Sequence, residues 1–346
     1  MIRYFYFICI FFICSCHTVN PYFDSKKKHH SVNGFKNTHA PPDQSLFQLL
    51  QWWLKHRQII AGLKHEKVDV KPVLPKTLIH NDPSTAQITW LGHSTILLQL
   101  KGFNILFDPI FSNRASPFSF LGPRRKSKLP IKLEKLPNID YIILSHDHYD
   151  HLDPQAIAKI VALNPDVQIL TPLAYKKWFE KMNIYNVFEL DWWDELDNDK
   201  ITFHLTPAQH WCRRTLFDKN ERLWGSWLIE TEGFKFYFAG DSGYGDHYKT
   251  INKKFGPIDF SAIPIGSYLP NWIMKFQHMK PMEAAKAHID LASKFSLGIH
   301  WGTFILSDEA LHQPKEDLIL AVNQLKPKMP FKTIAIGESL KVKLRP

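Results

Sequence analysis

Residues 146–151 concentrate side chains that bind metal ions. The segment reads HDHYDH, so three imidazoles and a usable carboxylate occupy six positions. Imidazole and carboxylate are suitable ligands for zinc, iron or manganese. The apolar run 141–144 just before it predicts a buried strand, and a buried group of three histidines is hard to satisfy without a metal. The pattern therefore favours a metal-binding loop over a chance polar loop.

Three further ligand candidates lie downstream. His210, Asp241 and His300 each stand at or after the end of a run that predicts a strand. An isolated His or Asp in a loop is usually a surface residue or a hydrogen-bond partner, so each alone would mean little. The complete order of the residues is more specific than any part of it. We therefore expect seven metal ligands: His146, His148, Asp150, His151, His210, Asp241 and His300.

The order of these ligands resembles the metallo-β-lactamase superfamily. The resemblance implies an α/β fold in which two sheets are sandwiched between helices, a four-layer αββα sandwich. It also implies two divalent metal ions, with Zn²⁺ expected, although iron or manganese would accept the same ligands. A hydroxide between two such ions is a nucleophile at neutral pH, since metal binding lowers the pKa of water. By the resemblance, one ion is held by His146, His148 and His210, the other by Asp150, His151 and His300, and Asp241 bridges both.

Motifs outside the ligands narrow the resemblance to one branch. They are WLGHST at 90–95, DPIFS at 108–112, PAQHW at 207–211, IPIGSY at 263–268 and HWGTF at 300–304. These motifs are similar to the N-acyl-phosphatidylethanolamine-hydrolysing phospholipase D family. That family cleaves a membrane phosphodiester, which releases an N-acylethanolamine and leaves phosphatidic acid. We therefore expect a metal-dependent phosphodiesterase of the phospholipase D type.

The same resemblance implies catalytic roles for four residues. Asp150 and Asp241 would orient the reacting groups while they bind the ions. Gln277 and His278 would lie near the ions and contact the substrate phosphate. His278 would stabilise charge at phosphorus or protonate the leaving oxygen. The alternative is an ordinary surface histidine at the start of a helix.

Four other polar residues, in these motifs or close to them, have less defined roles. His93 and Asp108 are expected to support the ligands or the structure rather than to catalyse. Arg213 and Arg214 either hold phosphate or are solvated basic side chains, and the sequence leaves both open.

The N-terminus predicts export. A short positive start precedes ten apolar or aromatic residues, 4–13, which are too few to span a bilayer but suit a secretory signal. Cys14, Ser15 and Cys16 then resemble a bacterial lipobox, in which a small residue precedes the lipidated cysteine. We interpret residues 1–16 as the leader of a membrane-anchored lipoprotein of the cell envelope. A plain signal or anchor and an unprocessed start are the alternatives.

The polar residues 17–44 predict a tether, and residues 45–346 predict the hydrolase domain. The domain begins with an amphipathic helix, 45–64, which either packs on the domain or touches a membrane.

The net charge of +10 favours anionic partners. We expect a membrane phospholipid as substrate, and a membrane surface that binds lipidated Cys16 or this helix. We expect no nucleic acid, because no basic module with interleaved aromatic residues is present; a homodimer is expected from the resemblance only.

The remaining pattern indicates strands with helices after some of them and hairpins elsewhere, which is typical of α/β layers. Two other functions stay open. The same ion pair would serve a lactonase or another hydrolase of a soluble substrate, and a degenerate centre would suit a non-catalytic envelope lipoprotein. Strands are predicted at 87–91, 95–100, 102–107, 140–144, 201–205, 227–231, 235–239, 296–300, 332–336 and 340–344, and helices at 155–163, 281–294 and 318–325.

Overall fold

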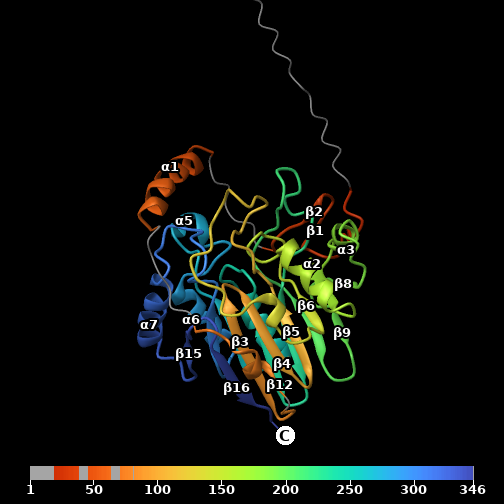
Figure 1. Cartoon of the computed structure of the whole chain (residues 1–346). Helices are drawn as coiled ribbons and strands as arrows, with labels where there is room; N and C mark the ends of the chain where they lie inside the picture. Colours follow the sequence, from red (N-terminus) through yellow and green to blue (C-terminus); the bar gives the residue numbers. More distant parts are fainter. Residues whose placement is uncertain (1–18, 39–45, 64–70, 81, 346) are drawn as a thin grey trace, which may run out of the picture.

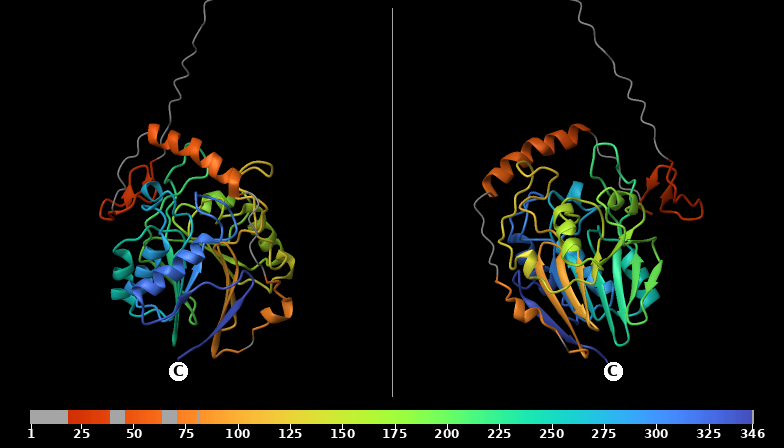
Figure 2. Two further views of the ribbon diagram at one scale, coloured as in Figure 1. Left: turned by 90° about the vertical axis from the view of Figure 1, so that its left-hand side faces the viewer. Right: turned by 45° about the vertical axis from the view of Figure 1, so that its right-hand side comes forward.

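The computed structural model describes residues 19–38, 46–63, 71–80 and 82–345. Two seven-stranded sheets stack face to face, and helices cover the outer face of each (Figures 1 and 2). The expected αββα sandwich is therefore confirmed.

The first sheet contains the early strands and the last one. Its strands from β16 to β5 are antiparallel, and those from β5 to β8 are parallel. The C-terminal β16 pairs with β3, the first strand of the sheet in sequence. The order is β16 (Ser339–Lys343), β3 (Thr85–Gly92), β4 (Thr95–Leu100), β5 (Phe103–Phe107), β6 (Tyr141–Ile143), β7 (Gln168–Pro172) and β8 (Val187–Leu190).

The second sheet repeats this plan. Its strands from β9 to β12 are antiparallel, and those from β12 to β15 are parallel. The order is β15 (Phe331–Lys332), β14 (Ser296–Ile299), β13 (Phe260–Pro264), β12 (Phe234–Phe238), β11 (Ser226–Thr231), β10 (Thr202–Thr206) and β9 (Glu195–Asp197). In both sheets the parallel strands end at an edge where loops can gather, which is where α/β proteins place their sites.

Strand alternation divides the core into two layers. Ile96, Leu98 and Leu100 of β4 pack between the sheets, whereas Leu97 packs on the outer side, because successive side chains of a strand point to opposite faces. Both faces of β4 are buried, so the strand reads as a continuous apolar run.

Helices complete the outer layers. On the first sheet, α2 begins where Asp153 accepts hydrogen bonds from the Gln155 and Ala156 amides, and it buries Ile157 and Ile160. On the second sheet, α6 and α7 pack against each other and on β13 and β15. The helices are α2 (Pro154–Leu163), α3 (Lys176–Glu180), α4 (His247–Phe255), α5 (Asn271–Met274), α6 (Pro281–Asp290) and α7 (Gln313–Leu325), with 3-10 turns η2 (Pro75–Leu78) and η3 (Leu133–Lys135).

The tether prediction is wrong for residues 19–38. This segment forms the hairpin β1 (His30–Ser31) and β2 (Gly34–Phe35), which packs on the domain (Figure 1). Phe35 is buried in the core between the sheets, and Asp191 binds the two histidines at the start of the hairpin. Long-range contacts therefore fix a segment whose composition is that of a linker. The predicted leader, 1–16, and residues 39–45 lie outside the described residues.

The predicted N-terminal helix is present as α1 (Leu46–Gly62). It lies across one end of the molecule, above α5 (Figures 1 and 2). His56 Nδ1 lies 2.5 Å from Asp308 Oδ1, and the Trp52 ring stacks on His56, so one turn of the helix is tied to the domain. None of the described helices is both long and apolar enough to cross a membrane.

Candidate metal centre

The seven predicted ligands stand on four loops at one edge of the two sheets. The segment 146–151 follows β6, His210 follows β10, Asp241 follows β12, and His300 follows β14. The sheets place these loops together because β6 belongs to the first sheet and the other three strands belong to the second. Ser145 anchors the first loop, since its amide donates to Asp108 Oδ1 at 2.8 Å.

Three imidazoles form the first ligand group. His146 Nε2 lies 2.9 Å from His148 Nδ1, and His210 Nε2 lies 3.1 Å from the same atom. His146 and His210 are buried. Nitrogens bound to one tetrahedral zinc ion at about 2.0–2.1 Å would lie roughly 3.3 Å apart, so this spacing suits a shared ion.

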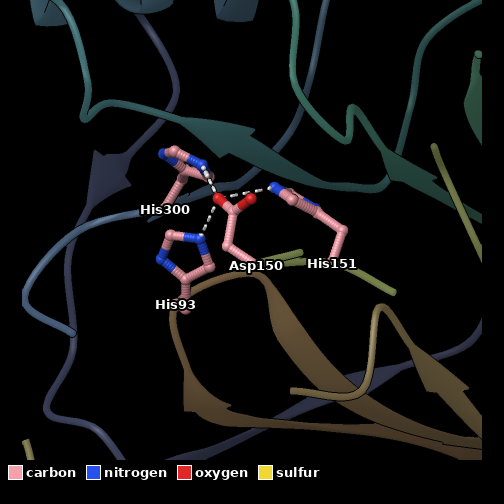
Figure 3. A group of neighbouring side chains, drawn as sticks. All are labelled: His93, Asp150, His151 and His300. Atoms are coloured by element: carbon pink, nitrogen blue, oxygen red, sulfur yellow. Dashed lines mark hydrogen bonds and ion pairs between the residues drawn. The ribbon is translucent and has the colours of Figure 1, made fainter. Parts of the chain in front are cut away.

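The second ligand group contains a carboxylate. Asp150 Oδ2 lies 3.3 Å from His300 Nε2 and 3.4 Å from His151 Nε2 (Figure 3). His93 Nε2 approaches the same oxygen at 2.9 Å. The predicted support role of His93 agrees with this geometry, because its ring holds Asp150 and lies beside His300, at 4.2 Å between ring centroids.

Asp241 lies between the two groups. Its Oδ2 is 3.1 Å from His300 Nε2 and 3.2 Å from His151 Nε2, and it is 3.8 Å from His210 Nε2 and 3.9 Å from His146 Nε2. One carboxylate oxygen therefore faces both groups, as expected of a bridging ligand.

The donor set fits two divalent ions. Nitrogen and oxygen donors converge without thiols, which suits zinc, iron or manganese. Among the described residues, His148 Nε2, His151 Nε2 and Asp241 Oδ1 are buried without a hydrogen-bond partner. Because such buried polar atoms are costly, bound ions would relieve part of that cost at His151 and Asp241.

Electrostatics differ between the groups before an ion binds. Burial and the neighbouring His151 hold the pKa of His146 well below its usual range, and burial does the same to His210. In the second group, burial opposes the charged forms, yet Asp241 and Asp150 raise the pKa of His300 to about 9. Burial would likewise raise the pKa of Asp241, but His151 and His300 hold it well below its usual range.

Two of the ligand histidines, His151 and His210, are held in orientation by contacts to Nδ1, the ring nitrogen that faces away from the ions. Asp108 is fully buried, and its Oδ2 lies 2.6 Å from His151 Nδ1 while it also accepts the Ser145 hydroxyl at 2.6 Å. His210 Nδ1 lies 2.9 Å from the main-chain oxygen of Gln277. Such contacts fix the tautomer of a ligand and leave Nε2 free for the ion.

The structure brings His278 to the centre and places Gln277 differently. His278 Nδ1 lies 3.8 Å from Asp241 Oδ2, and the ring lies between the rings of His210 and His300, with centroids 5.2 Å and 5.5 Å away and the side chain 11% exposed. It is not an ordinary surface histidine. The Gln277 side chain contacts the sulfur of Met274 at 3.8 Å, so its main chain rather than its amide supports a ligand.

Sequence reasoning missed Asn37. Its side-chain amide donates to the main-chain oxygen of His210 at 2.8 Å, and the His210 amide donates back to Asn37 Oδ1 at 3.1 Å. The residue lies in the segment taken for a tether, and no local signal marks it. Arg214, left open as a phosphate ligand, donates instead to the main-chain oxygens of Asp147 and Leu152.

Comparison with known proteins identifies the family. A model described as a β-lactamase superfamily domain matches residues 103–301, and the chain belongs to the metallo-β-lactamase superfamily. Within it, the predicted resemblance to the N-acyl-phosphatidylethanolamine-hydrolysing phospholipase D branch is confirmed. The N-acyl-phosphatidylethanolamine-hydrolyzing phospholipase D 1 of Caenorhabditis elegans is 41% identical over 81% of this chain and 85% of its own length. The mitochondrial N-acyl-phosphatidylethanolamine-hydrolyzing phospholipase D of Saccharomyces cerevisiae is 36% identical over 71% of this chain and 54% of its own length.

Solved structures agree on the fold. An isothiocyanate hydrolase from Delia radicum gut bacteria superposes with a TM-score of 0.60 at 19% identity, over 75% of this chain and 100% of that one. A metallo hydrolase from the archaeon Ignicoccus hospitalis gives 0.57 at 17% identity over 75% and 100%. The chain is thus a metal-dependent hydrolase by family.

Proposed function

We propose that this hydrolase is a phosphodiesterase of the phospholipase D type that acts on N-acyl-phosphatidylethanolamine. The observation that carries the proposal is the His278 ring, which faces Asp241 beside a complete two-ion ligand set. The two relatives named for this activity support it. Hydrolysis would break the bond between phosphorus and the ethanolamine oxygen; the water oxygen ends on phosphorus, and a proton ends on the released N-acylethanolamine.

Ions bound by the two groups would supply Lewis-acid stabilisation and a hydroxide nucleophile at neutral pH. The chain supplies orientation and a hydrogen-bond donor. Burial lowers the pKa of His278 to about 4, so the ring is neutral at neutral pH. A neutral imidazole can donate a hydrogen bond to a phosphoryl or leaving oxygen, and we therefore favour this role over that of a cationic acid.

An apolar rim supports a membrane substrate. Exposed side chains on α1, on α5 and on two loops, 112–123 and 213–220, form this rim, and α1 and α5 lie at the same end of the molecule (Figures 1 and 2). The loop 213–220 joins the ligand loop through the Tyr149 hydroxyl, which donates to the Arg214 main chain at 2.8 Å. Exposed apolar side chains around a site are typical of membrane contact. The rim consists of Phe47, Leu50, Leu54, Phe118, Phe120, Leu121, Leu216, Phe217 and Trp272.

The experiment that tests the substrate is product analysis by mass spectrometry. Zinc-loaded protein is incubated with vesicles that contain N-acyl-phosphatidylethanolamine, beside the Asp241→Asn variant. N-acylethanolamine and phosphatidic acid, both absent with the variant, would support the proposal. Turnover of a soluble lactone or phosphodiester with no lipid product would keep the hydrolase and reject the lipid substrate.

Membrane contact is tested by vesicle flotation of a Leu216→Asp, Phe217→Asp double variant. These side chains are 82% and 71% exposed, so the substitutions should leave folding intact. We expect weaker flotation and slower lipid turnover with unchanged cleavage of a soluble phosphodiester. The matched control is Leu320→Asp, since Leu320 is exposed on α7, outside the rim. Equal flotation of the double variant and the control would contradict membrane contact through the rim.

A further inference from the structure

The Asn37 side chain forms two hydrogen bonds with the main chain of a metal ligand, His210. It pairs with His210 in both directions, donating from Nδ2 to the carbonyl oxygen and accepting at Oδ1 from the amide. His210 lies in a loop beyond β10, where none of the described strands pairs with its main chain. The side-chain amide of Asn37 instead supplies the hydrogen-bond partners that a neighbouring strand would supply. The backbone of His210 is thus fixed by residue 37, while its ring is fixed by the Gln277 carbonyl.

The hairpin that carries Asn37 is joined to the same loop a second time. The Phe35 amide donates to the Asn220 carbonyl oxygen at 2.8 Å, and the Asn220 amide donates to the Cys212 oxygen at 2.8 Å. Gly34 makes this approach possible, because a Cβ built there would lie 2.1 Å from the Asn220 oxygen. Contacts from β2 onward therefore brace the loop that carries His210 on both sides.

The other end of the segment is locked on Asp191. Lys27 forms an ion pair with this buried carboxylate, His29 Nε2 lies 2.6 Å from Oδ1, and His30 Nε2 lies 2.9 Å from Oδ2. Two histidines and an aspartate could suggest a third metal site. However, His30 Nδ1 accepts the Asp24 amide at 3.1 Å, so Nε2 carries the proton and donates to Asp191. With an ammonium group also on Asp191, the cluster is a hydrogen-bonded lock.

We propose that residues 19–38 form a clasp that positions the first metal ion, with Asn37 as the positioning residue for His210. The lock at Asp191 holds the segment on the domain, Phe35 and Gly34 fix its approach, and Asn37 sets the main chain of His210. The proposal rests on the two-ion centre and is independent of the lipid substrate. Because only His210 of the seven ligands touches the clasp through these hydrogen bonds, loosening it should affect the two ions unequally.

The test compares zinc affinities of full-length variants by chelator competition. Asn37→Leu keeps the side-chain size and removes both hydrogen bonds, and we expect one of the two ions to bind roughly 10-fold more weakly, the other remaining tight. The Co²⁺-loaded variant should show an altered absorption spectrum. Asn37→Asp keeps the acceptor for the His210 amide and should restore part of the affinity. The control is Tyr22→Phe, which removes only the hydrogen bond to Glu189 Oε2 at 2.6 Å within the same segment.

Several outcomes would overturn the clasp. Asn37→Leu that binds both ions as tightly as the unaltered chain would do so. Tyr22→Phe that lowers the affinity for zinc as much as Asn37→Leu would also do so. If Asn37→Leu fails to fold, Asp191→Asn releases the distant lock instead and should weaken the same ion to a smaller degree; unchanged affinity there contradicts the proposal. Unaltered protein that binds no zinc would refute the centre itself, whereas tight zinc without lipid turnover would refute only the proposed substrate.

Discussion

The two ligand groups of the centre are built in different ways. The first contains three imidazoles, and its His210 depends on the side chain of Asn37 and on the main-chain oxygen of Gln277. The second contains Asp150 and two histidines, and buried side chains of Asp108 and His93 hold it. The first group therefore relies on the segment 19–38 and on the loop between α5 and α6, and the second relies on residues that directly follow strands β3 and β5 of the first sheet.

Charge follows the same division. Burial lowers the pKa of His146 and His210, so the first group is neutral and has little internal attraction before an ion arrives. In the second group, Asp241 and Asp150 raise the pKa of His300 to about 9, so ion pairs hold the group together. We infer that the second group is organised in the ion-free protein and that the first group needs its ion or its neighbours.

Removing Asp241, the ligand shared by both groups, should impair the two groups alike. Asp241→Asn affects both groups, because Oδ2 faces four of the ligand histidines. Loss of several kcal/mol of transition-state stabilisation predicts a fall in kcat/KM of about 1,000-fold or more. Metal analysis together with hydrolysis rates checks this. Retention of two ions at full affinity would show that Asp241 does not bridge.

Substitution of His278 tests whether the two groups suffice without a third component. His278→Ala should keep both ions and lower kcat about 100-fold, since a donor to the reacting oxygens is lost. Steady-state kinetics on vesicles, with metal content measured in parallel, separates the effects. Loss of an ion instead would make His278 a ligand, and an unchanged kcat would remove it from catalysis.

Substitution of Asp108 should weaken the second group more than the first, because its direct contact with a ligand ring is the one to His151. Asp108→Ala leaves His151 Nδ1 without its partner, and we expect roughly 10- to 100-fold weaker binding of one ion. The control is Asp153→Ala, another buried aspartate, which caps α2 and touches no ligand. It should cost about 1 kcal/mol of stability and leave metal affinity unchanged. Similar loss of zinc in both variants would mean that general destabilisation explains the effect.

The smallest expected effect is a dependence of the clasp on pH. Although burial would raise it, hydrogen bonds from His29 and Lys27 hold the pKa of Asp191 well below its usual range. A carboxylate with a depressed pKa stabilises the fold above its unfolded pKa of about 3.9, and this contribution is lost as pH falls further toward the folded pKa. The unfolding free-energy difference between the unaltered chain and Asp191→Asn should therefore be larger at pH 7 than at pH 3. An equal difference at both values would show that the charge of Asp191 does not hold the clasp.

The ligands were predictable because they are compact in sequence or follow recognisable strands. The segment 146–151 is recognisable from its three histidines and its carboxylate. Strands β4 and β5 were predicted within one residue of their observed bounds. Other strands, among them β7 and β13, were missed, since each is only five residues long and ends in proline, a residue that argues against a strand. The hairpin of residues 19–38 was missed for another reason: its stability comes from Asp191 and from the loop after β10, which local composition does not reveal.

The position of β16 has a consequence for synthesis of the chain. Ser339–Lys343 pairs with β3, which is made almost the whole domain earlier. While the ribosome adds the residues between them, the edge of β3 has no partner, although the rest of the first sheet has already emerged. An uncovered strand edge is a template for pairing with other chains. Pairing with β16 therefore covers this edge of β3 late in synthesis, and until then a chaperone that shields β3 would have a defined target.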